Sequence, residues 1–156
     1  YYAYDPGFRL QGEAMHIHIN AINGFDHRKM LINFALTGSM GIKSLKEKND
    51  FLFRGKHCCT LWVLLKSGVI KNIYGIKKLD KDKSVIFIMQ RFNEGDEVLE
   101  NMVGNEKQVL ARIYIVSKTK EELVSKINSI KSNLSVIDKD DNEMIIDLLD
   151  TSLLLQ

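Results

Sequence analysis

A helix signal stands out between residues 26 and 38, where apolar positions recur every three to four residues. Asp26 is a good helix N-cap for HRKMLINFALT, and Gly38 follows as a C-terminal stop. The pattern places Met30, Leu31, Phe34 and Ala35 on one face. We therefore expect a helix over residues 27–37.

From residue 57 onward the hydrophobic period changes from helical to extended. The runs CCTLWVLL and VIKNIYGI are joined by Lys66-Ser67-Gly68, a combination typical of a β-hairpin. VIFIMQRF predicts another buried strand, and NEGDEV predicts a turn. QVLARIYIV predicts a further strand, in which residues 110, 112, 114 and 116 alternate with residues 109, 111, 113 and 115.

A second helix signal begins at Thr119. Thr119 and Glu122 have the spacing of a capping box, and apolar side chains follow at helical intervals. This stripe consists of Leu123, Ile127, Ile130 and Leu134. A short strand, SVID, and an apolar tail complete the chain. Strands around one amphipathic helix predict an α+β unit over residues 57–150.

Three segments carry weaker signals. Residues 1–4 are typical of a strand that stops at Pro6-Gly7. Within residues 12–23, MHIHIN alternates like a strand, but it is short and has turn residues on both sides, so the pattern leaves its structure open. Residues 39–56 are polar and irregular, and they are interpreted as a connection between two substructures.

Composition excludes several classes of protein. The chain has 156 residues, 45% of them hydrophobic, which is enough to bury a core. A formal charge of +2 is too small for a nucleic-acid-binding surface. The lysines alternate with acids or lie in loops, so we interpret Lys43, Lys46 and Lys48 as part of a solvated face.

The two cysteines and the lengths of the apolar runs indicate the cellular compartment in which the protein is expected. Cys58 and Cys59 are neighbours, so in a strand they point to opposite faces and cannot share a metal site or an ordinary disulfide. No apolar run reaches the roughly 18 residues that span a bilayer. The N-terminus does not resemble a signal peptide. We expect a soluble, cytoplasmic protein with no membrane partner.

The order of these features resembles the C-terminal part of an ATP-grasp ligase, the superfamily of carbamoyl phosphate synthetase, biotin carboxylase and the L-amino acid ligases. There, a strand carries Glu-x-Asn-Pro-Arg, a glycine-containing loop follows, and Gly-x-Asp opens a helix that ends in glycine. The matching elements are DPGFR at residues 5–9, Gly12, GFD at residues 24–26, and the helix ending at Gly38. The hairpin, GDEV turn, strand and Thr119 helix resemble the family's small C-terminal domain.

The resemblance gives the DPGFR stretch a chemical role. It implies that Asp5 is a metal ligand for magnesium or manganese and that the catalytic Arg9 clamps phosphoryl oxygens of ATP or of an acyl phosphate. Two departures from the family stand out. Gly7 replaces the second ligand, asparagine, and aspartate is one methylene shorter than glutamate. The alternative is that Asp5-Pro6-Gly7 forms an ordinary turn.

Other polar side chains are candidates for substrate contacts. His16 and His18, at i and i+2, would share a face of a strand, where they could bind zinc or face substrate in the ligase cleft. Glu13 lies near Arg9 in sequence and is either a substrate contact or a surface acid. Trp62 is expected in the core of the hairpin.

The resemblance therefore implies the C-terminal region of an ATP-dependent, ADP-forming carboxylate–amine or carboxylate–ammonia ligase. Residues 1–52 would end the ATP-grasp catalytic domain, and residues 53–156 would form a small α+β C-terminal domain. The first residue is Tyr1 rather than methionine, and the family's ATP-binding lysines and glycine-rich loop precede this motif. We therefore expect upstream ATP-grasp and N-terminal domains in the same protein, and no tight ATP binding or activity from residues 1–156 alone.

The rival interpretation is a non-catalytic module that kept the fold and binds a small ligand or another protein. In the ligase interpretation, the partners are small carboxylate and amine substrates. An unpaired sheet edge would also favour a homodimer.

Overall fold

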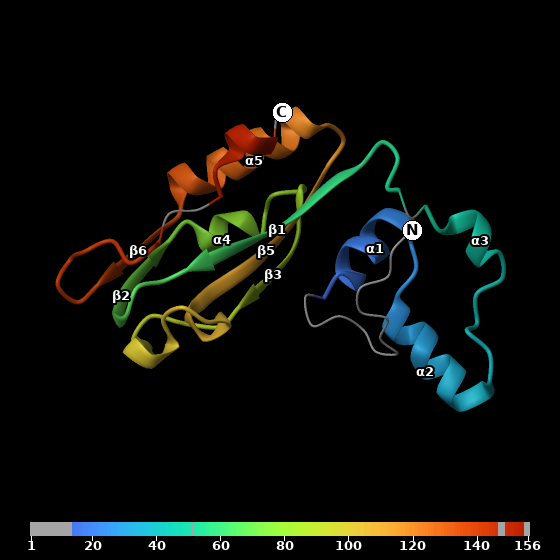
Figure 1. Ribbon diagram of the computed structural model, residues 1–156, viewed down its shortest axis with the longest axis horizontal. Coiled ribbons are helices and arrows are strands. Elements are labelled where there is room, and N and C mark those ends of the chain that lie inside the picture. Colours follow the sequence, from blue (N-terminus) through green and yellow to red (C-terminus); the bar gives the residue numbers. More distant parts are fainter. Residues whose placement is uncertain (1–13, 51, 147–148, 155–156) are drawn as a thin grey trace. The chain divides into compact units, whose positions relative to one another are not determined.

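The computed structural model describes residues 14–50, 52–146 and 149–154, and it divides into two compact units that adjoin in sequence at Arg54–Gly55 (Figure 1). Unit 1, before this junction, contains helices. Unit 2, after it, contains two small antiparallel sheets, a long helix and short helical turns. The predicted α+β class is confirmed. None of the described helices has the length and apolar character that crossing a membrane requires.

The described part of unit 1 contains three helices: α1 (His16–Asn23), α2 (His27–Thr37) and α3 (Leu45–Lys48). The predicted helix over residues 27–37 is confirmed with its cap and its glycine stop. Its apolar face, however, is mostly solvent-exposed, because Met30 is buried while Leu31 and Phe34 are not. HIHIN, residues 16–20, lies in helix α1 and Met15 is the N-cap, so the strand-like alternation is misleading.

The first sheet of unit 2 has the strand order β1-β5-β3. Its strands are β1 (His57–Leu64), β3 (Val85–Gln90) and β5 (Val109–Ser117), all antiparallel. Because β5 is central, side chains on both of its faces are buried, as its nearly continuous apolar sequence indicates. Strand β3 lies at an edge and leaves Phe87 and Met89 exposed, so the expectation that it is buried is wrong.

The predicted hairpin of the first two strands is also wrong. β2 (Gly68–Tyr74) belongs to a second sheet of order β4-β2-β6, with β4 (Glu97–Val98) and β6 (Ser135–Asp138). The link between β1 and β2 bonds to other segments: Leu65 N donates to Gln108 O at 3.1 Å, and Lys66 N donates to Met144 O at 2.8 Å. These bonds to distant segments carry the chain from one sheet into the other.

The NEGDEV segment forms the predicted turn before β4. Asp96 N donates to Asn93 O at 3.1 Å, and the Asp96 carboxylate accepts from Asn93 N at 2.7 Å. Short helical segments lie between the strands and after the last one. α4 (Ile76–Leu79) lies between β2 and β3, η1 (Glu100–Met102) and η2 (Glu106–Gln108) lie between β4 and β5, and η3 (Thr151–Leu154) follows β6.

Helix α5 (Lys120–Asn133) packs against β1 and β5, covering one side of the sheet in Figure 1. Thr119 Oγ1 accepts from Glu122 N at 3.1 Å, which confirms the predicted cap. The Glu122 carboxylate accepts from Lys118 N, one residue before the position that a standard capping box uses. Leu123, Ile127 and Ile130 are buried as predicted.

One hydrophobic core joins both sheets and α5. It includes alternate residues of β1 and β5 together with the α5 stripe. Its fully buried members with the largest side chains include Leu65, Ile70, Ile113, Ile127 and Met144. Lys126 of α5 also pairs with Asp82, which follows α4, so an ion pair ties the helix to the connection before β3.

Candidate functional site

The GFD segment at residues 24–26, one of the elements on which the sequence resemblance rests, forms the turn between α1 and α2. Gly24 ends α1 in a left-handed conformation with φ 73°, which glycine adopts without strain, and its N–H donates to Asn20 O at 2.9 Å. Asp26 is extended and accepts from Arg28 N at 2.8 Å, so it caps α2. Two local signals therefore fix the turn between the helices.

The cap of α2 is also an ion pair. The Arg28 guanidinium lies 3.3 Å from the Asp26 carboxylate and holds the pKa of that carboxyl below its usual range. Asp26 is thus ionised at neutral pH and already engaged by Arg28. Its position next to the first N–H groups of α2 is also favourable for a negative charge.

The two histidines of α1 do not share a face. Residues two apart on an α-helix differ in direction by about 200°, so the strand geometry expected for His16 and His18 is wrong. His18 is buried, with 1% of its surface exposed. His16 is half-buried, and burial, followed by the nearby charge of Arg28, lowers its pKa. One ligand cannot face both rings directly, whereas a substrate contact by either residue stays a prediction.

Asp5, Arg9 and Glu13 lie outside the described residues, as do Gly7 and Gly12. Their roles as metal ligand, phosphoryl clamp and substrate contact stay predictions from the sequence. The first described residue after them is Ala14, which leads directly into α1.

Unit 1 also contains a pocket of about 530 Å³ between α1, α2 and the segment that leads into α3. Its lining residues are Asn20, Gly24, Phe25, Asp26, Lys29, Met30, Asn33, Met40, Gly41, Ile42, Lys43, Ser44 and Lys48. Sequence reasoning missed this site, because its three lysines come from separate elements and have no common spacing. Lys43 and Lys48, interpreted as part of a solvated face, are exposed but line this concavity.

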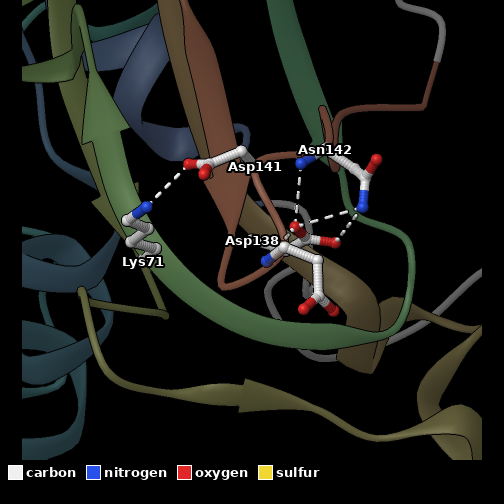
Figure 2. A network of polar contacts seen from close by, with 5 residues as sticks. Lys71, Asp138, Asp141 and Asn142 are labelled. Atoms are coloured by element: carbon white, nitrogen blue, oxygen red, sulfur yellow. Dashed lines mark hydrogen bonds and ion pairs between the residues drawn. The ribbon is translucent and has the colours of Figure 1, made fainter.

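The most acidic loop of unit 2, residues 138–143, has a structural role (Figure 2). The Asp138 carboxylate accepts from the backbone N–H groups of Asn142 and Asp140 at 2.8 Å each, and these bonds lower its pKa. Lys71 on β2 pairs with Asp141 at 2.6 Å. These contacts close the turn after β6. In the described residues, no cluster of His, Cys, Asp or Glu side chains is arranged to hold a metal ion.

Cys58 and Cys59 point to opposite faces of β1, as predicted, and neither forms a disulfide. Cys58 lies opposite Val116 and Cys59 opposite Ile115, on the two faces of β5. Burial raises the pKa of both thiols, so both are protonated at neutral pH. This environment is that of packing cysteines rather than of a nucleophile.

Trp62 lies on the other face of the sheet from the core residues Leu61 and Val63, so its expected place in a hairpin core is wrong. The Arg112 guanidinium lies 4.2 Å from the centre of the Trp62 ring, in a cation–π contact. Arg112 also pairs with Glu106 at 3.3 Å. The indole is therefore covered by a neighbouring side chain of the same sheet.

Comparison with known proteins gives a structural likeness but no match in sequence. No protein-family model matches the chain, and no curated protein matches it. An L-amino acid ligase from Bacillus licheniformis superposes with a TM-score of 0.64 over 85% of this chain, at 14% identity. A phosphoribosylglycinamide synthetase from Anaerococcus prevotii superposes with a TM-score of 0.53 over 80% of it, at 20% identity.

This chain spans 31% of the L-amino acid ligase and 30% of the synthetase. At such low identities the likeness shows the fold alone. The structural comparison adds a likeness in fold to the resemblance in sequence. The chain shares its fold with part of an L-amino acid ligase and with part of a phosphoribosylglycinamide synthetase.

Proposed function

We propose that this chain is the C-terminal part of an ATP-dependent, ADP-forming ligase that joins a carboxylate to an amine or to ammonia through an acyl phosphate. The observation that carries this proposal is the superposition of 85% of the chain on an L-amino acid ligase. The local structure of residues 24–38 agrees with it, because the glycine turn, the aspartate cap and the glycine stop follow the family's order.

In this proposal the chemistry belongs to the DPGFR stretch. A carboxylate such as Asp5 is a hard oxygen ligand that suits magnesium, which in such enzymes also binds the phosphates of ATP. Arg9 would bind phosphoryl oxygens with its planar fork of donors and neutralise the charge that develops as phosphate is transferred. Gly7 has no side-chain oxygen, so Asp5 would be the metal ligand that this stretch supplies.

A second candidate is a non-catalytic module that uses the same fold to bind a small ligand or a protein. The presence of Gly7 where the family has a metal-binding asparagine favours it. The two candidates differ in one property, because the ligase forms ADP and the module does not.

The test uses the whole protein that the gene encodes. With Mg-ATP, we expect ADP release that requires both a carboxylate and an amine, screened over amino acids and small organic acids. Residues 1–156 alone should release no ADP and bind Mg-ATP no more tightly than about 1 mM, or about −4 kcal/mol, in calorimetric titration. If the whole protein forms no ADP with any substrate pair, the non-catalytic module is favoured.

A further inference from the structure

We propose that the pocket of unit 1 is a binding site for a small organic anion, a molecule with an apolar body and a phosphate or carboxylate group. The pocket is formed by α1, α2, α3 and the connecting segment, all within unit 1. This inference is independent of the ligase proposal, because it uses neither Asp5 nor Arg9.

Three cations line the pocket from three separate elements. Lys29 comes from the first turn of α2, Lys43 from the segment before α3, and Lys48 from the end of α3. None of the three forms an ion pair with a described residue. No described carboxylate neutralises their charges, and their convergence on one concavity raises the local attraction for an anion.

The acidic side chain that lines the pocket does not cancel this charge. Asp26 is the acid among the described lining residues, and its carboxylate already accepts from Arg28 N and pairs with the Arg28 guanidinium. Arg28 itself is not a lining residue. Among the described residues, the lining thus presents three lysines outside any ion pair and one acid that Arg28 already pairs.

The remaining lining suits an organic ligand rather than a bare inorganic ion. Phe25 and Met30 are buried, with 4% and 7% of their surfaces exposed, and with Ile42 they add apolar surface to the lining. The Asn33 amide and the Ser44 hydroxyl add neutral hydrogen-bonding groups. A volume of about 530 Å³ is within the range of about 300–1,000 Å³ that small-molecule sites occupy.

Gly41 determines how closely the connecting segment approaches α2. It has φ 72°, and a Cβ at this position would lie 2.6 Å from Asn33 Nδ2. A larger residue would therefore displace the Asn33 amide or the segment that carries Lys43. The close approach keeps Lys43 on the same pocket as Lys29 of α2.

The experiment is a calorimetric titration of the 156-residue chain with three probes: phenyl phosphate, phthalate and inorganic phosphate. We expect phenyl phosphate to bind more tightly than inorganic phosphate, because only the former also contacts the apolar lining. Tighter binding of phthalate than of phenyl phosphate would indicate a carboxylate site, and the reverse order would indicate a phosphate site. Binding should weaken as salt rises from about 0.01 M to 0.15 M, where the screening length falls from about 30 Å to 8 Å.

Charge-reversal variants test whether these lysines form the site. Lys48→Glu should weaken binding of the tighter organic probe by roughly tenfold, since an attraction becomes a repulsion. The matched control is Lys46→Glu, on the same helix but outside the pocket lining. Both lysines are exposed, so both variants should keep the circular dichroism spectrum of the parent chain.

The site is supported if Lys46→Glu keeps the parent chain's affinity for the tighter organic probe and Lys48→Glu loses it. Equal losses in the two variants would show diffuse attraction to the surface and would overturn it. Absence of binding of both phenyl phosphate and phthalate at concentrations up to about 10 mM would also overturn it. Equal affinity for phenyl phosphate and inorganic phosphate would overturn the organic character of the ligand.

Discussion

Unit 2 and unit 1 use their apolar residues differently. In unit 2 the central strand β5, the α5 stripe and both sheets bury their apolar side chains in one core. In unit 1 the described buried hydrophobic residues are Ala14, Phe25 and Met30, while Leu36 of α2 is 78% exposed. The elements of unit 1 are fixed mainly by local signals such as the Asp26 cap and the glycine stop, whereas those of unit 2 are fixed by packing.

The same substitution in the two units tests this contrast most strongly. Leu123→Ala removes a side chain of the α5 stripe that packs in the core, so it should lower the free energy of unfolding by about 2–5 kcal/mol. Leu36→Ala removes a largely exposed side chain, so it should change that free energy by no more than about 0.5 kcal/mol. Chemical denaturation of both variants measures the difference. Equal losses would mean that the apolar face of α2 is as well packed as that of α5.

The two helix caps give a smaller effect that sharpens the comparison. Thr119→Ala removes the side-chain acceptor for Glu122 N and should cost about 1 kcal/mol of the stability of unit 2. Asp26→Ala removes the acceptor for Arg28 N in unit 1. Because little core supports α2, we expect the backbone amides of α2 to exchange faster with solvent in Asp26→Ala. The denaturation midpoint of unit 2 should stay unchanged. Hydrogen exchange that shows no change in α2 would contradict the local origin of this helix.

An effect similar in size to that of the Thr119 cap is predicted for acid stability. The ion pair with Lys126 lowers the pKa of Asp82 from 3.8 to about 2, with hydrogen bonds from Ser84 contributing. A carboxyl whose pKa is lowered on folding stabilises the fold above its unfolded pKa, and this contribution is lost as the pH falls through its folded pKa. The loss therefore falls between about pH 5 and pH 2.

Both groups of this pair remain about a quarter exposed, so we expect a contribution of about 1 kcal/mol rather than the full linkage value. Asp82→Asn should reduce stability at pH 7 by this amount and flatten the acid side of the stability profile. Urea denaturation from pH 7 to pH 2 measures both. A variant whose stability falls with acid as steeply as that of the parent chain would show that another carboxyl causes the loss.

The sequence predicted the elements whose signals are local. The caps at Asp26 and Thr119, the stop at Gly38 and the apolar run of β5 all have partners within a few residues or an unambiguous pattern. The hairpin failed because β2 pairs with β6, more than 60 residues away, and such distant pairing leaves no mark on the turn between β1 and β2. MHIHIN was ambiguous because a short alternation does not separate a strand from a helix.

The candidate sites divide in a similar way. The glycine turn at Gly24 and the cap at Asp26 are predictable because their signals lie in neighbouring residues of the sequence. The lysine-lined pocket could not, because Lys29, Lys43 and Lys48 converge only when α2, α3 and the segment between them are in place. Likewise, Trp62 was assigned to a core because its neighbours are apolar, whereas its side chain lies on the opposite face, under Arg112.

The most direct test of the ligase proposal is the turnover of Asp5→Asn and Arg9→Lys in the whole protein that the gene encodes. Each should lose roughly 100- to 1,000-fold in rate, or about 2.7–4 kcal/mol of transition-state stabilisation. High magnesium should partly rescue Asp5→Asn by filling a weakened site, but not Arg9→Lys, which keeps its charge and loses the bidentate fork. Asp140→Asn and Arg54→Lys, at exposed positions, are the matched controls and should keep full activity. Folded Asp5 and Arg9 variants that retain activity within a few-fold would contradict the proposal and leave DPGFR as an ordinary turn.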